Sequence, residues 1–135
     1  MGSGDELKLQ ADQACQAAEE FTERFYDALD KRKHQILTKL YLETASLVWN
    51  GNAMNGNQDI ARFLETLPSS EHAVDVLDAQ PIPSEVTAGQ TSILITTGGT
   101  VKYQGHSPKA FNQNFILTTQ NNVWKIASCA FRSHD

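Results

Sequence analysis

The side chains that most often carry catalysis or bind metals are scattered along this 135-residue chain. They are His34, His72, His106, His134, Cys15 and Cys129. A zinc site needs several such ligands at short, regular spacing, and a nucleophilic cysteine needs a neighbouring base. The sequence contains neither pattern, and it contains no glycine-rich phosphate loop. We therefore expect no bound metal, no cofactor and no nucleophilic catalysis.

The charge balance argues against nucleic-acid binding. The chain has 11 Lys and Arg against 16 Asp and Glu, a formal net charge of -5, whereas nucleic-acid-binding domains use a basic face to displace phosphate counterions. We therefore expect no direct contact with RNA or DNA. The sequence has no apolar leader, no apolar run of membrane length and no CxxC spacing. These features predict an intracellular protein with reduced cysteines and no membrane contact.

The first half of the chain predicts three helices around a small hairpin. Over residues 5–29, small and apolar residues recur at spacings of three and four, which places them on one helical face. They are Leu7, Ala11, Ala14, Ala18, Phe21, Phe25 and Ala28. Asp30 is placed to cap a second helix, and a third amphipathic helix stops at Pro68. Between them a short strand ends at Asn50-Gly51, a pair that makes tight hairpins.

After Pro68 the sequence is typical of strands joined by turns. The predicted strands cover residues 71–80, 91–103, 110–120 and 123–131. Within the second of these, Gly98-Gly99 predicts a bend. The chain is therefore expected to be an α+β domain over residues 5–135, with the first helix lying across a large antiparallel meander. Residues 1–4 are expected to be flexible, and they are either native or a cloning remnant.

The last two predicted strands, AFNQNFILTTQNNVWKIASCAF (residues 110–131), carry large apolar side chains on both faces. A two-residue turn at Asn121-Asn122 would pair Leu117 with Ile126, Phe115 with Ser128, Gln113 with Ala130 and Phe111 with Arg132. An antiparallel sheet that is covered on one side only should alternate cleanly between apolar and polar residues. The second face therefore predicts a sheet-to-sheet contact with another protein.

Several segments of this sequence, in this order, resemble the nuclear transport factor 2-related export proteins. They are DQACQAAEEF (12–21), LYLETASLVWNGN (40–52), LPSSEH (67–72), LDAQPI (77–82), FNQNFILT (111–118) and VWKIAS (123–128). The resemblance spans nearly the whole chain. It implies a nuclear transport factor 2-like cone, in which three N-terminal helices pack on a bent antiparallel sheet around a cavity.

The resemblance also implies the partner and the function. Proteins of this family are the small, non-enzymatic subunit of the mRNA export receptor. They form a heterodimer with the homologous domain of a large nuclear export factor, and the complex binds the phenylalanine-glycine repeats of nucleoporins. The protein is then expected in the nucleus and at the nuclear pore, from which it shuttles to the cytoplasm. An arginine in the last strand of these proteins pairs with an acid of the partner, and here it matches Arg132.

With the predicted register, Arg132 places five further residues in the partner-binding surface. They are Ala130, Ser128, Ile126, Gln113 and Phe115. The sequence departs from the family where Cys129-Ala130 precedes the Phe-Arg pair, since relatives carry an acidic residue and then cysteine there.

Two alternatives remain open. The first is a homodimeric import carrier that binds the GDP form of the Ran GTPase. The second is a small isomerase or dehydratase of the same fold, which would use a carboxylate base and a tyrosine donor inside the cone. Tyr26 and Tyr41 are the candidate donors, Trp49 could line the pocket, and Asp75 or Asp78 could act as the base. No pair of these residues stands at a diagnostic spacing, so we expect a binding module.

Overall fold

The computed structural model describes residues 3–83 and 91–134, with side chains from residue 8 onward. The helices are α1 (Ser3–Asp30), α2 (His34–Lys39) and α3 (Asn57–Glu65). The strands are β1 (Tyr41–Trp49), β2 (Asn52–Asn55), β3 (Ser70–Ile82), β4 (Ser92–Tyr103), β5 (Lys109–Gln120) and β6 (Val123–His134). Helix α1 begins at Ser3, and Met1 and Gly2 lie outside the described residues.

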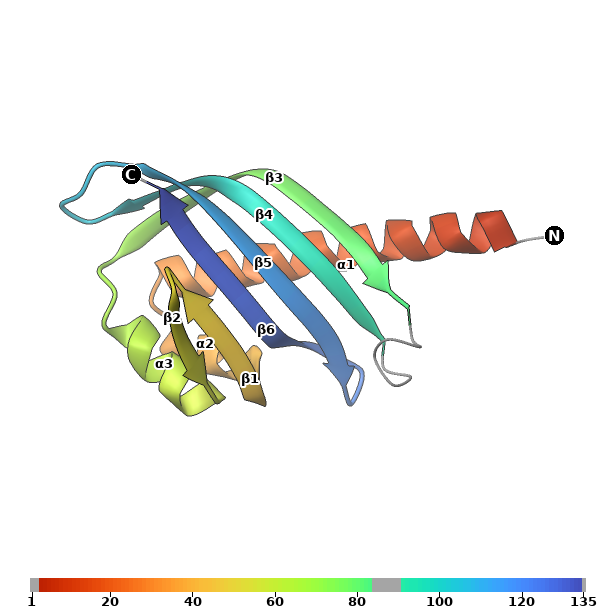
Figure 1. Ribbon diagram of the computed structural model, residues 1–135, viewed down its shortest axis with the longest axis horizontal. Helices are drawn as coiled ribbons and strands as arrows, with labels where there is room; N and C mark the ends of the chain where they lie inside the picture. Colours follow the sequence, from red (N-terminus) through yellow and green to blue (C-terminus); the bar gives the residue numbers. More distant parts are fainter. Residues whose placement is uncertain (1–2, 84–90, 135) are drawn as a thin grey trace.

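The strands form one six-stranded sheet in the order β2-β1-β6-β5-β4-β3. Strands β3 to β6 make the predicted antiparallel meander, and β1 adds to it in parallel with β6. Figure 1 shows α1 lying across one face of the bent sheet, while α2 and α3 gather beside β1 and β2. The predicted α+β architecture with three helices is confirmed.

Helix α1 packs on the sheet through the face that its sequence pattern predicts. Ala14 and Ala18 are buried, and they let the helix approach the sheet closely. Further along, Phe25 meets Phe115 of β5 edge to face, with 5.0 Å between the ring centroids. The core of the molecule therefore lies between α1 and one face of the sheet.

The two predicted tight turns adopt the backbone that such turns require. Asn121 and Asn122 have φ of 54° and 65°, and Asn50 and Gly51 have φ of 48° and 86°. Positive φ at both central residues matches the twist of the flanking strands. These turns set the register at the start of the β5–β6 and β1–β2 pairs.

A β-bulge in β3 bends the edge of the sheet. The pairing with β4 shifts between Val74 and Val76, so that Asp75 is the extra residue. Opposite the bulge, a Cβ atom on Gly99 would lie 1.9 Å from the carbonyl oxygen of Ala73, so only glycine fits without backbone movement. Gly99 therefore permits the close approach of β3 at the bulge.

A second bulge overturns the predicted register of β5 and β6. The pairing runs as predicted from Gln120↔Val123 to Leu117↔Ile126, but Ser128 then pairs with Ile116 and makes Ala127 the extra residue. The observed pairs beyond it are Phe115↔Cys129, Gln113↔Phe131 and Phe111↔Ser133. The predicted pairs beyond Leu117 are wrong because nothing local in the sequence marks the inserted residue.

Candidate functional site

One face of the sheet carries no helix, and we call it the open face. Its side chains are Ser46, Val48, Val76, Asp78, Gln80, Leu94, Thr96, Asn112, Asn114, Ile116, Ser128, Ala130 and Arg132. The large apolar members are Val48, Val76, Leu94 and Ile116, with exposed fractions of 41%, 59%, 37% and 36%. Strands that are half-buried in a monomer rarely present this many apolar groups to water. The open face therefore has the composition of a protein-binding surface.

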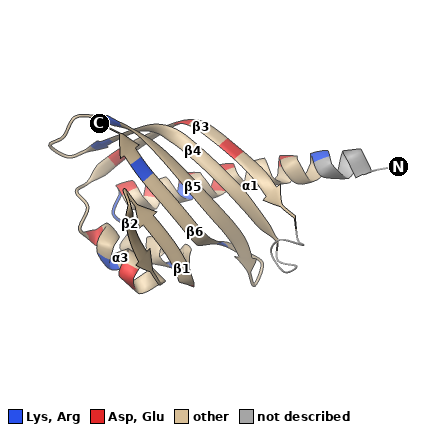
Figure 2. Cartoon of the chain, viewed as in Figure 1, with Lys and Arg blue, Asp and Glu red and all other residues tan. Residues whose placement is uncertain are grey.

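Arg132 lies on this face near the end of β6, directly opposite Asn112 of β5. Its side chain is exposed, and it makes no ion pair with any residue that the structure describes. Ser128 and Ala130 precede it on the same strand and the same face. Its neighbours on β5, Asn112 and Asn114, are uncharged, and Figure 2 shows the central part of β5 without charge. A free guanidinium among apolar and small polar groups suits recognition of a carboxylate.

The other three residues predicted for partner binding lie on the opposite side of the sheet. Ile126, Gln113 and Phe115 are fully buried beneath α1. The bulge at Ala127 causes this correction, because it exchanges the two faces of β6 relative to the assumed pairing. Of the predicted set, only Arg132, Ala130 and Ser128 belong to the open face.

The space under α1 is filled by a hydrogen-bonded network. The Tyr26 hydroxyl donates to Gln113 Oε1 at 2.7 Å and shares a 2.8 Å hydrogen bond with Thr97 Oγ1. Gln113 Nε2 donates to Cys129 Sγ at 3.0 Å. Burial raises the pKa of the Tyr26 phenol above its ordinary value, and it raises the pKa of the Cys129 thiol to about 12. These groups stay neutral at physiological pH and fix the core.

Tyr41 also lies in the core and does not line a pocket. Its hydroxyl is buried without a hydrogen-bond partner among the described residues, and burial raises its pKa well above the ordinary value. Asp75 and Asp78 are exposed on β3, whereas Tyr26 and Tyr41 are buried, and no hydrogen bond among the described residues joins either aspartate to either tyrosine. The structure therefore does not join the carboxylates and tyrosines that the sequence suggested as base and donor.

A half-buried cluster of hydrogen bonds that the sequence analysis missed joins the end of α1 to the start of β3. Asp30 accepts hydrogen bonds from Ser70 Oγ at 2.9 Å, from the backbone N–H of His72 at 2.8 Å and from His72 Nδ1 at 2.6 Å. Burial alone would raise the pKa of the Asp30 carboxyl, but the bonds from His72 and Ser70 hold it below its ordinary value. Since Asp30 and His72 are 42 residues apart, no local pattern predicts this contact.

Asp30 consequently does not cap α2 as predicted. The residue at the N-cap of α2 is Lys33, and no side chain makes a capping hydrogen bond there. The basic residues Lys31 and Lys33, which follow α1, form ion pairs with Asp27 at 2.7 and 3.0 Å.

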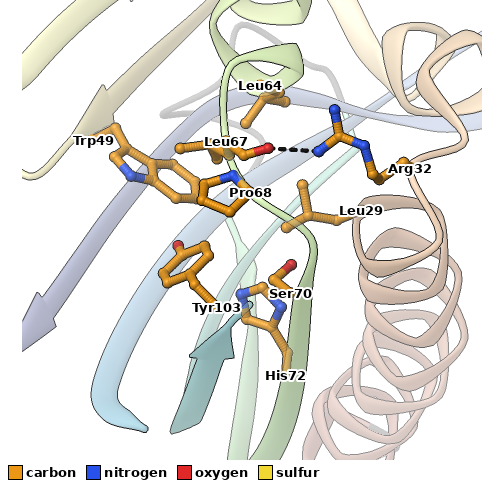
Figure 3. Close-up of a pocket in the computed structure, with 9 residues that line it drawn as sticks. All are labelled: Leu29, Arg32, Trp49, Leu64, Leu67, Pro68, Ser70, His72 and Tyr103. Atoms are coloured by element: carbon orange, nitrogen blue, oxygen red, sulfur yellow. Dashed lines mark hydrogen bonds between the residues drawn. The ribbon is translucent and has the colours of Figure 1, made fainter. Parts of the chain in front are cut away.

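A small pocket lies beside the contact between Asp30 and His72 (Figure 3). Its lining residues are Leu29, Arg32, Trp49, Leu64, Leu67, Pro68, Ser70, His72 and Tyr103. The cavity volume is about 10 Å³, room for about one water molecule, whereas pockets for small ligands enclose roughly 300–1,000 Å³. Of the residues predicted to line a pocket, Trp49 does so, and Tyr26 and Tyr41 do not.

Arg32 closes one side of this pocket. Its guanidinium donates to the backbone carbonyl of Leu67 (Figure 3) and to that of Glu65 at 3.1 Å, and it thereby caps the C-terminal end of α3. Arg32 has φ of 55°, the left-handed conformation that normally selects glycine after a helix. Inside the pocket, His72 Nε2 is buried without a described partner.

The described residues contain no group of three or more His, Cys, Asp or Glu side chains that could hold a metal ion. Among the helices that the structure describes, none is both long enough and apolar enough to span a membrane. The open face, with Arg132 near the end of β6, is the feature that most needs a functional explanation.

Comparisons with known proteins identify the family. Residues 17–133 match the nuclear transport factor 2 (NTF2) domain. The chain is 49% identical to human NTF2-related export protein 2, an alignment that covers 100% of this chain and 97% of that protein. It is 32% identical to the NTF2-related export protein of Caenorhabditis elegans, over 100% of this chain and 98% of that protein.

Solved structures show the same fold at lower sequence identity. Nuclear transport factor 2 from Cryptosporidium parvum superimposes with a TM-score of 0.77 at 21% identity, over 93% of this chain and 95% of that one. A chain of the Candida albicans Mtr2–Mex67 M domain complex gives a TM-score of 0.73 at 15% identity, over 90% of this chain and 96% of that one. Fold and sequence together show that this chain belongs to the NTF2 family and, within it, to the NTF2-related export proteins.

Proposed function

We propose that this protein is the small, non-enzymatic subunit of an mRNA export receptor, and that it binds the NTF2-like domain of a large nuclear export factor through the open face. The observation that carries the proposal is the unpaired Arg132 on a sheet face with four exposed large apolar side chains. The full-length similarity to NTF2-related export proteins supports the assignment to export.

The physical basis of the proposal is the free energy needed to remove water from the charged side chain of Arg132. When a partner sheet excludes water from the open face, Val48, Leu94 and Ile116 supply hydrophobic contact area at its centre. The guanidinium of Arg132 would then lose its water, and it needs a carboxylate in return. Breaking such a buried pair typically costs about 3–5 kcal/mol, so Arg132 would select a partner that carries the acid.

The proposal includes a place of action. In complex with the large factor the protein would reach nuclear pores, where the complex binds phenylalanine-glycine repeats of nucleoporins, mainly through the large subunit. It would act in the nucleus and at the pore and shuttle to the cytoplasm. The relatives' role as export proteins supports this part of the proposal.

The test is co-expression with the NTF2-like domain of the large export factor from the same species, followed by size exclusion and calorimetry. We expect a 1:1 complex that Arg132→Glu weakens by about 2–5 kcal/mol. Arg24→Glu is the matched control, because Arg24 is exposed on α1 on the other side of the sheet. Unchanged affinity of the Arg132 variant would remove this residue from the interface, and the absence of any complex would refute the proposed function.

A further inference from the structure

Asp78 on β3 is the counterpart of Arg132 on the open face. It pairs with Thr96 in a row of directly opposed residues that continues through Asn114 and Ala130 to Val48. All five side chains are exposed, so the row lies on the open face. Asp78 is therefore held by regular strand pairing and not by a loose loop.

The Asp78 carboxylate has no cation partner among the described residues. Within residues 3–83 and 91–134, it accepts a hydrogen bond from Gln80 Nε2, at 3.4 Å. By contrast, the exposed Asp59 on α3 pairs with Arg62 at 3.1 Å. Asp78 thus shares with Arg132 the combination of an unpaired charge and a position on the open face.

Arg132 and Asp78 are too far apart to neutralise each other. Strands β5 and β4 lie between β6 and β3, which makes three inter-strand spacings, or roughly 14 Å. This distance exceeds the Debye length of about 8 Å at physiological salt. The open-face residues between the two charges include Asn112, Asn114 and Thr96, all uncharged, and Figure 2 shows β4 and β5 without charge across this region.

We propose that Asp78 is a second charged determinant of the interface with the large export factor, and that the partner places a lysine or arginine against it. The inference rests on the proposed function. A partner sheet would then carry an acid and a base in the reverse order and at the same separation. Two separated charge pairs fix the direction in which one sheet lies on the other, which a single pair cannot do.

A simpler explanation is that Asp78 protects an edge strand. Strand β3 is at the edge of the sheet, and charged side chains on edge strands prevent unwanted pairing between sheets. Under that explanation, replacing Asp78 would change aggregation of the free protein and would leave its affinity for the partner unchanged. The two explanations therefore differ in one measurable quantity.

The experiment measures the Kd for the partner's NTF2-like domain with Asp78→Lys, Asp78→Asn and the control Asp75→Lys. Asp75 is exposed on the same strand, but the bulge removes it from the paired rows. We expect Asp78→Lys to weaken binding by about 30-fold or more, Asp78→Asn by about 5-fold to 10-fold, and the control by less than about 2-fold. Equal effects of Asp78→Lys and Asp75→Lys would assign the loss to general edge charge and overturn the inference.

A compensation experiment completes the test. Each lysine and arginine on the sheet face of the partner is changed to aspartate in turn, and one of these variants should restore binding to Asp78→Lys. If none does, the direct pairing is refuted. The absence of any complex would refute the proposed function itself, whereas a complex that Arg132→Glu weakens and Asp78→Lys leaves intact would refute only this inference. The isosteric Asp78→Asn variant serves if the lysine variant fails to fold.

Discussion

At the scale of single residues, distant partners decide what each charged group does. Asp30 ends α1, where the negative end of the helix dipole disfavours a carboxylate. The hydrogen bonds from Ser70 and His72 outweigh this repulsion and tie the helix to β3. The turn residues Asn121 and Asn122 could be predicted from sequence because positive φ is a local property. The role of Asp30 could not, because its partners are remote in sequence.

The Asp30 contacts predict a dependence of stability on acid. The folded state lowers the pKa of this carboxyl below its ordinary 3.8, so its stabilisation is fully present above that value and is lost as the pH falls through the folded pKa. Asp30→Asn should therefore reduce the free energy of unfolding by about 1–3 kcal/mol near neutral pH and by less at a pH of about 3. Urea unfolding at both pH values measures the difference.

The control for this prediction is Asp59→Asn. Asp59 pairs with Arg62 on the surface, and exposed pairs of this kind contribute about 0–1 kcal/mol. If Asp30→Asn behaved like Asp59→Asn at neutral pH, the hydrogen bonds to Ser70 and His72 would contribute nothing to stability.

At the scale of elements, strand existence and turns could be predicted, but the bulges could not. The strands end within a few residues of their predicted bounds, because Gly105 and Asn121-Asn122 interrupt the apolar pattern. Strand β3 is longer than predicted, because it continues through Pro81, which pairs with Ile93. The bulge at Ala127 leaves no such mark, since both faces of β6 carry apolar and small polar residues. Hence the predicted partner-binding set mixed Arg132 with core residues, and its members on the open face could be identified only with the observed register.

The bulge in β3 predicts a marked difference between two adjacent glycines. Gly99→Ala should lose about 2–3 kcal/mol of stability, because the new Cβ would lie 1.9 Å from the Ala73 carbonyl oxygen and the backbone would have to move. In Gly98→Ala the nearest atom is the Asn112 Oδ1 at 3.1 Å, and that side chain can turn away. Denaturant unfolding should show a loss below about 1 kcal/mol for Gly98→Ala. Similar values for both variants would contradict the close approach of β3.

At the scale of the whole molecule, one face of the sheet is packed against α1 and the other face is uncovered. Helix α1 lies against one face of the sheet (Figure 1) and encloses the core with it. The open face presents apolar side chains on β1, β3, β4 and β5. A domain of this kind is stable alone but gains further stability from its partner. The sequence signalled this organisation through strands with apolar groups in both phases.

Partner binding should therefore raise the thermal midpoint of this protein in proportion to the logarithm of partner concentration. A partner at about one hundred times its Kd adds about 2.7 kcal/mol to the free energy of unfolding. Ile116→Ser should reduce this gain and leave the free chain nearly unchanged, because Ile116 is 36% exposed. Differential scanning calorimetry with and without partner gives both values.

Ile36→Ser is the matched control. Ile36 is 45% exposed on α2, which is not part of the open face. Equal loss of the partner-induced shift in both variants would mean that the partner does not recognise the open face specifically.

The single inserted residue in β6 reverses the alternation of its side chains between the core and the open face. Before Ala127 one set of alternate positions points into the core, and after it the other set does. Phe131 therefore points into the core and stacks on Trp49 at 3.9 Å, while its neighbour Arg132 points outward. Deleting Ala127 would restore the first alternation, and it would direct the guanidinium of Arg132 into the core and the phenyl ring of Phe131 into water. The capacity of this surface to recognise an acid thus depends on one small, chemically inert residue four positions before Phe131.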